Sequence, residues 1–134
     1  VAQNQIFYDT ASEQTLLNLV NKARQPQGLS TLSYDPPLQA VAREYARFML
    51  VDGFFSHTLT DGSSAADRVQ RAGMEYITLG ENLAFAPDVY IAHQGLMNSL
   101  GHRKNILSPD FGKAGIGVAD AGVYGKMFVQ MFSD

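Results

Sequence analysis

Apolar residues recur every three or four positions in two long stretches of the chain, the spacing that gathers them on one face of a helix. The first stretch covers residues 11–24, where Ser12 has the side chain of a helix N-cap. The second covers residues 36–51, where Asp35 is the expected cap and Pro36 takes the first helical position, which needs no N–H. Both stretches predict amphipathic helices with one face in the core.

Two shorter helices are predicted further along the chain. Ser64 and Asp67 have the spacing of a capping box ahead of residues 65–72. Residues 89–100 keep the helical period, and Gly101 follows them. Because glycine readily adopts the left-handed conformation that ends a helix, we expect this helix to stop at Gly101 and the chain to turn there.

The C-terminal part of the chain changes to the alternating period of a β-strand. Residues 115–119 and 124–132 predict a hairpin joined through residues 120–123, and residues 75–85 predict a further strand or an extended loop. A last strand that is apolar on both faces lies in the middle of a layered domain, so helices should cover each face of a small sheet. Its two faces are Tyr124, Phe128 and Phe132, and Met127, Val129 and Met131.

Length and composition narrow the class of protein. A chain of 134 residues suits a single domain, with residues 1–10 as a lead-in segment and residues 11–134 as the folded unit. A net charge of −3 without a basic cluster argues against nucleic acid as a partner. No apolar run is long enough to span a membrane, and the absence of cysteine excludes disulfides and thiolate metal sites. The first ten residues lack a signal-peptide pattern, so the protein is either not exported or has lost a leader.

Short polar stretches interrupt apolar sequence and carry the candidate chemistry. They are Ser56-His57-Thr58, Gly80-Glu81-Asn82 and the His102 that follows the expected helix end. A carboxylate in an apolar stretch needs a partner, and imidazole can be that partner or can bind a metal. We expect His57, Glu81 and His102 to converge on one concave site.

The same residues carry a family resemblance. His57 in FSHT, Glu81 in GENLA, the run LMNSLGHRKNILSPDFGKAGIGVA and the closing MFVQMFS resemble, in order and spacing, the SCP-type domain of the CAP superfamily. That group comprises cysteine-rich secretory proteins, antigen-five allergens and pathogenesis-related plant proteins, and the cysteine-free form is similar to its bacterial branch. The resemblance implies an α+β fold, a three-layer α-β-α sandwich around a small, mainly antiparallel sheet, in a secreted or cell-envelope protein.

The resemblance also implies a central cavity floored by two histidines and acidic partners, which in some members binds a divalent metal such as zinc. By position, the family histidines correspond to His57 and His102, and the first family glutamate corresponds to Glu81. Ser99 stands where the second glutamate belongs, and His93 occupies a usually aliphatic position.

Two imidazoles and one carboxylate make a weak zinc site, whose occupancy should be partial and pH-dependent because a protonated imidazole cannot bind a metal. His57 and His102 are the expected ligands, while Glu81 is either a third ligand or a base that holds a metal-bound water. The structural alternatives are a histidine bonded to a backbone carbonyl and an ion pair of Glu81 with Arg103 or a histidine. For Asn82, a bond to the backbone is favoured over a bond to a ligand.

Two other residues near the second histidine have weaker functional cases. His93 lies on the apolar stripe of its helix, so we expect it to be buried with a hydrogen-bonding neighbour or, alternatively, to reach the cavity as an extra ligand. Ser99 is a poor nucleophile candidate, because the expected helix stop separates it from His102 and no acid orients the pair.

Three functions are compatible with these residues. The first is a binding module whose cavity holds a divalent cation or a small polar ligand. The second is a metal-dependent, protease-like hydrolase with Glu81 as the base. The third is a lipid or sterol carrier with a groove near Tyr45, Phe54 and Phe55, and a peptide is a further candidate for the cavity or groove. The sequence contains no convincing nucleophile and leaves open whether the protein is an enzyme.

Overall fold

A computed structural model describes all 134 residues and has a five-stranded sheet at its centre. Four strands follow the order β1-β4-β5-β3 with antiparallel pairing, and β2 pairs in parallel with β4. The predicted hairpin forms the central pair, and the third predicted segment is a strand, β3, at the edge of the sheet. The strands are β1 (Phe7–Tyr8), β2 (Ser33–Tyr34), β3 (Leu79–Ala86), β4 (Lys113–Asp120) and β5 (Lys126–Ser133).

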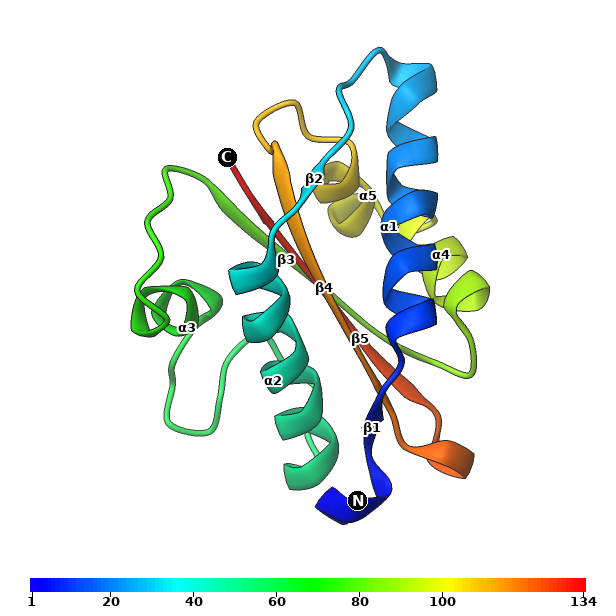
Figure 1. The fold of residues 1–134 in the computed structure, drawn as a ribbon, viewed down its shortest axis with the longest axis vertical. Coiled ribbons are helices and arrows are strands. Elements are labelled where there is room, and N and C mark those ends of the chain that lie inside the picture. Colours follow the sequence, from blue (N-terminus) through cyan, green and yellow to red (C-terminus); the bar gives the residue numbers. More distant parts are fainter.

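Five α-helices pack against the two faces of this sheet, so the chain has the expected α+β fold in an α-β-α arrangement (Figure 1). α2 and α3 lie on one side of the sheet, and α1, α4 and α5 lie on the other. No helix combines the length and the apolar character that crossing a bilayer requires. The helices are α1 (Thr10–Arg24), α2 (Pro36–Asp52), α3 (Ala65–Arg71), α4 (Val89–Met97) and α5 (Leu100–Ile106), with single 3-10 turns at η1 (Gln3–Gln5), η2 (Gln25–Gln27) and η3 (Gly122–Tyr124).

The last strand separates two hydrophobic cores, as its two apolar faces predict. Its odd-numbered residues pack with α2, and its even-numbered residues pack with α1 and α4. The first group is Met127, Val129 and Met131, and the second is Phe128 and Phe132. The alternation of side chains along one strand therefore sets the order of the layers.

The predicted N-cap of the first helix and the predicted start of the last strand are wrong. The N-cap of α1 is Asp9, whose carboxylate accepts both the backbone N–H and the hydroxyl of Ser12. Ser12 therefore donates to the cap and lies inside the helix. Tyr124, expected on the last strand, lies in η3 and is exposed, because the turn extends as far as Gly125 before β5 begins.

The helix expected over residues 89–100 is in fact two helices, and Gly101 ends neither of them. α4 ends at Met97, and the chain is extended at Ser99 before α5 begins. Gly101 and His102 lie in the first turn of α5, and Gly101 does not have the left-handed conformation that ends a helix. His102 is therefore carried by a helix rather than by a turn.

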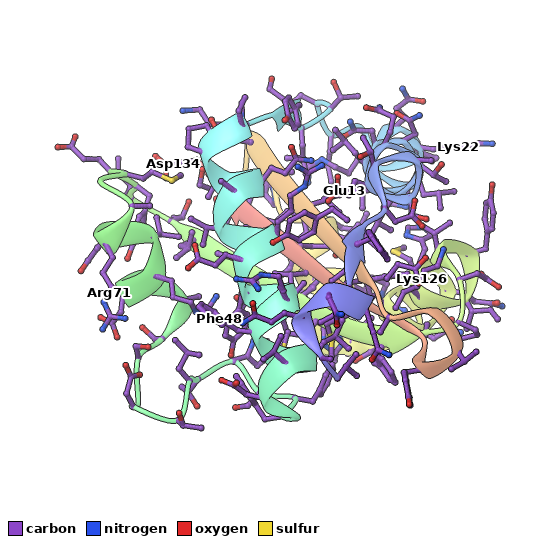
Figure 2. The ribbon with its side chains drawn as sticks, turned by 60° about the horizontal axis from the view of Figure 1, so that its bottom comes forward. Glu13, Lys22, Phe48, Arg71, Lys126 and Asp134 are labelled. Atoms are coloured by element: carbon purple, nitrogen blue, oxygen red, sulfur yellow. The ribbon has the colours of Figure 1, made fainter.

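Buried polar contacts join α1 to the rest of the molecule. Glu13 lies between α1 and α2 (Figure 2), where its carboxylate binds the Arg43 guanidinium and accepts a backbone N–H of β4. Arg24, at the other end of α1, is almost completely buried and donates to three backbone carbonyls of residues 106–111. The Arg24 contacts hold the chain that follows α5 against α1 and so help to place His102.

Candidate functional site

Glu81 and His57 form a hydrogen-bonded pair beside the edge strand of the sheet. Glu81 is on β3, and the alternation of the strand turns its side chain toward α3. His57 follows α2 in a loop, and its Nδ1 lies 2.9 Å from Oε1 of Glu81. The His57 side chain is 59% exposed while that of Glu81 is 4% exposed, so a buried carboxylate orients an accessible imidazole.

Arg68 of α3 holds this pair in place. Its Nη1 lies 2.7 Å from Oε2 of Glu81, and its Nη2 lies 3.2 Å from Oε1 of Glu81 and 2.9 Å from the carbonyl oxygen of His57. The guanidinium also lies over the ring of Tyr45, 3.4 Å from its centroid. A two-pronged contact with a guanidinium stabilises the ionised carboxylate, which can only accept hydrogen bonds. His57 therefore carries its hydrogen on Nδ1 and leaves Nε2 free.

Of the two alternative partners expected for Glu81, the histidine is present as His57, whereas Arg103 donates to the carbonyl of Met97, 3.4 Å away. The second partner, Arg68, is a residue that sequence analysis missed. A buried carboxylate does predict that a cation lies nearby. Arg68 is on the predicted capping-box helix, but no local pattern separates it from Arg71 on the same helix.

His102 is held by two contacts of its own. Its Nδ1 lies 2.9 Å from Oγ of Ser99, so the expected separation of these two residues by a helix stop is wrong. Its backbone carbonyl oxygen accepts a hydrogen bond from Nδ2 of Asn82, 3.0 Å away. This is the bond to the backbone that was expected for Asn82. Burial lowers the pKa of His102 below its ordinary value, and the charge that His57 can carry lowers it further. Both causes favour the neutral form of the His102 ring.

Two asparagines connect the two halves of the site. Nδ2 of Asn105, on α5, lies 2.8 Å from Oδ1 of Asn82 and 3.4 Å from the carbonyl oxygen of Glu81. Because Glu81 and Asn82 are neighbours on β3, their side chains point to opposite faces of the sheet. The edge strand thus links His57, on the α3 side, to His102, on the α5 side.

An open hollow of about 510 Å³ lies on the His57 side of the strand. His57 and Glu81 line it, whereas His102, Ser99 and Asn82 do not. No group of three or more histidine, aspartate or glutamate side chains is close enough together to hold a metal ion. The other lining residues are mostly small or polar: Thr58, Ser64, Ala65, Ala66, Tyr76, Leu79 and Gly80.

The third histidine, His93, differs from the other two. It lies on α4 and does not line this hollow. Its Nδ1 is buried without a hydrogen-bond partner, so the expected hydrogen-bonding neighbour is absent. Burial lowers the pKa of His93, and the ring is therefore held in its neutral form.

A second hollow, of about 750 Å³, is almost entirely apolar. It lies toward the other end of β3, at Phe85, and extends to the loop after α2. Phe54 and Phe55 line it, in agreement with the predicted groove. Tyr45 does not, because its ring is buried and its hydroxyl donates to the carbonyl of Ser56.

Sequence comparison finds a family that covers nearly the whole chain. The model of the cysteine-rich secretory protein family, CAP, matches residues 17–132. YlbC, an uncharacterized membrane protein of Bacillus subtilis, is 34% identical over 122 residues, which make up 90% of this chain and 35% of YlbC. The chain therefore spans about a third of the length of that relative.

Two solved structures resemble this one closely. An extracellular protein from Bacillus anthracis that contains a SCP domain has a TM-score of 0.84 and 32% identity, over 93% of this chain and 41% of that chain. An outer surface protein from Borrelia burgdorferi has a TM-score of 0.89 and 23% identity, over 96% of this chain and 97% of that one. The second likeness is one of fold alone.

Proposed function

The chain belongs to the cysteine-rich secretory protein (CAP) family, and on that premise we propose that it is a secreted or cell-envelope binding module in which His57 and His102 take a divalent metal ion or a small polar ligand. The observation that carries the proposal is the pair formed by His57 and Glu81, with 2.9 Å between Nδ1 and Oε1. A carboxylate on one ring nitrogen is the usual support of a histidine that binds a metal through the other nitrogen. An extracellular relative with a SCP domain supports the proposed location.

The donors present suit a weak, open metal site and not a structural zinc site. Structural zinc takes four protein ligands, whereas no cluster of three or more candidate ligands is present here, and the proposed site has only the imidazoles of His57 and His102. A bound zinc ion would supply positive charge and open positions for water or for an anionic group of a ligand. Both oxygens of Glu81 are engaged by Arg68, so this carboxylate orients His57 and is a poor candidate for a base. These contacts favour binding over the metal-dependent hydrolase.

Calorimetric titration of metal-free protein with zinc tests the proposal, and the third histidine supplies a matched control. The wild type and His93→Ala should bind zinc at pH 7.5, whereas His57→Ala and His102→Ala should lose measurable binding. Binding should weaken as the pH falls, because protonated imidazole cannot ligate. Identical isotherms for all four proteins would remove the metal from the proposal.

A second candidate function, carriage of an apolar ligand, is favoured by the hollow of about 750 Å³. Its lining offers hydrocarbon and aromatic surface, which suits the acyl chain of a lipid better than a peptide, whose backbone groups need hydrogen-bond partners. Binding of a fluorescent fatty acid should weaken about tenfold in Phe85→Ser, since one aromatic contact is lost. Ile77→Ser alters an exposed residue outside this hollow and is the control. Equal binding by the wild type and both variants would exclude the hollow as the lipid site.

A further inference from the structure

Ser99 is the N-cap residue of α5, but its hydroxyl does not cap the helix. Its backbone is extended, as an N-cap requires, and its carbonyl accepts the N–H of Arg103 at 2.8 Å. At each of the other four α-helices, the N-cap side chain accepts the backbone N–H of the third residue after it. Those four caps are Asp9, Asp35, Ser64 and Asp88. Ser99 therefore gives up an interaction that stabilises helix ends.

The hydroxyl of Ser99 is instead 2.9 Å from Nδ1 of His102. The backbone of His102 is fixed separately, because Asn82 on β3 donates to its carbonyl. Ser99 thus holds the ring while Asn82 holds the main chain. Of the two ring nitrogens, only Nε2 is left for another partner.

We propose that Ser99 is a positioning residue: its hydroxyl oxygen accepts a hydrogen bond from Nδ1–H of His102. Nε2 is then unprotonated, and its lone pair is free to bind a ligand. This inference rests on the proposed function, because the choice of tautomer matters only where Nε2 binds a ligand. Histidines that bind ligands are commonly oriented by an acceptor on the other ring nitrogen. Glu81 does this for His57, so both imidazoles then offer the same nitrogen.

The tautomer of His102 tests this inference directly in metal-free protein at pH 7.5. Nitrogen-15 NMR of the imidazoles should show hydrogen on Nδ1 of His102 as the major form in the wild type. In Ser99→Ala, the ratio of the Nδ1–H to the Nε2–H form should fall about fivefold, the equivalent of one hydrogen bond of about 1 kcal/mol. Ser99→Thr keeps the hydroxyl and should restore the ratio. The signals of His57 and His93 are internal controls that should not change.

Two results would overturn the inference. One is an Nε2–H form of His102 as the major species in the wild type, because the hydroxyl of Ser99 would then donate the hydrogen bond to Nδ1. This result is obtained on the wild type and does not depend on the folding of a variant. The other is an unchanged ratio in folded Ser99→Ala. A zinc titration without binding would remove the metal from the proposed function but leave the tautomer result standing, so the two failures are distinguishable.

Discussion

Nη1 of Arg68 lies 2.7 Å from Oε2 of Glu81, and both side chains are less than 10% exposed. The same guanidinium donates to the carbonyl of His57 and lies over the ring of Tyr45. One side chain of α3 thus joins the edge strand, the loop that carries His57 and the core-facing side of α2. The arrangement of the His57 side of the site depends on this buried ion pair.

Arg68→Met should destabilise the protein by about 3–5 kcal/mol, because it leaves the Glu81 carboxylate buried without its cation. Urea unfolding at pH 7 measures the loss. The double variant Arg68→Met/Glu81→Leu removes both charges and should recover part of the stability, since a buried pair can be replaced by apolar side chains at little cost. A double variant no more stable than Arg68→Met would contradict this account.

His57→Gln should raise the pKa of His102. Burial is the larger cause of its lowered pKa and the charge of His57 the smaller, so the pKa in the variant should rise but stay below 6.5. Proton NMR titration of the His102 ring measures the change, and His93→Gln is the control. Because the folded-state pKa is lowered, the contribution of His102 to stability is complete above pH 6.5 and declines as the pH falls below it. An unchanged His102 pKa in His57→Gln would mean that the charge of His57 does not act on His102.

Asp9 should make the protein sensitive to acid. Burial alone raises the pKa of this carboxyl, but the bonds from Lys126 and Ser12 outweigh burial and bring the pKa from 3.8 to about 2. This shift corresponds to about 2 kcal/mol of stability, present above pH 4 and lost as the pH falls through 2.

Asp9→Asn tests this contribution, because asparagine keeps the helix cap while removing the charge. The variant should be less stable than the wild type at pH 7, and the difference should shrink between pH 4 and pH 2 in urea unfolding. Asp52→Asn, at an exposed carboxylate, is the control. A difference that persists unchanged at pH 2 would assign the loss to the cap and not to the charge.

Gly117→Ala should destabilise the protein by about 3 kcal/mol, because the added methyl group would overlap the backbone of α2 at Ala42 and Arg43. Gly112→Ala is the matched control, since a methyl group there meets open space. Thermal unfolding of the two variants measures the contrast. Equal melting temperatures would mean that α2 can move away from the sheet without cost.

The site was only partly predictable, and the reason differs from residue to residue. His57, Glu81 and His102 stand out because each is a polar residue in apolar sequence, and the structure brings them to the same edge strand. Arg68 does not stand out, because its role depends on a contact with a strand that follows it in the chain. The contact between Ser99 and His102 is unpredictable for another reason: Gly101 has the sequence context of a helix end but lies in the first turn of a second helix.

The sequence by itself determines the order of the layers in this protein. Alternating apolar residues on both faces of β5 require cover on both sides, and helical spacing supplies that cover, because burial leaves a periodic pattern along the chain. Only the tertiary structure decides that Arg68 pairs with Glu81, that Ser99 contacts His102 and that Nδ1 of His93 is left without a partner. Those contacts depend on how whole elements pack against one another, and the local pattern of apolar and polar residues does not predict that packing.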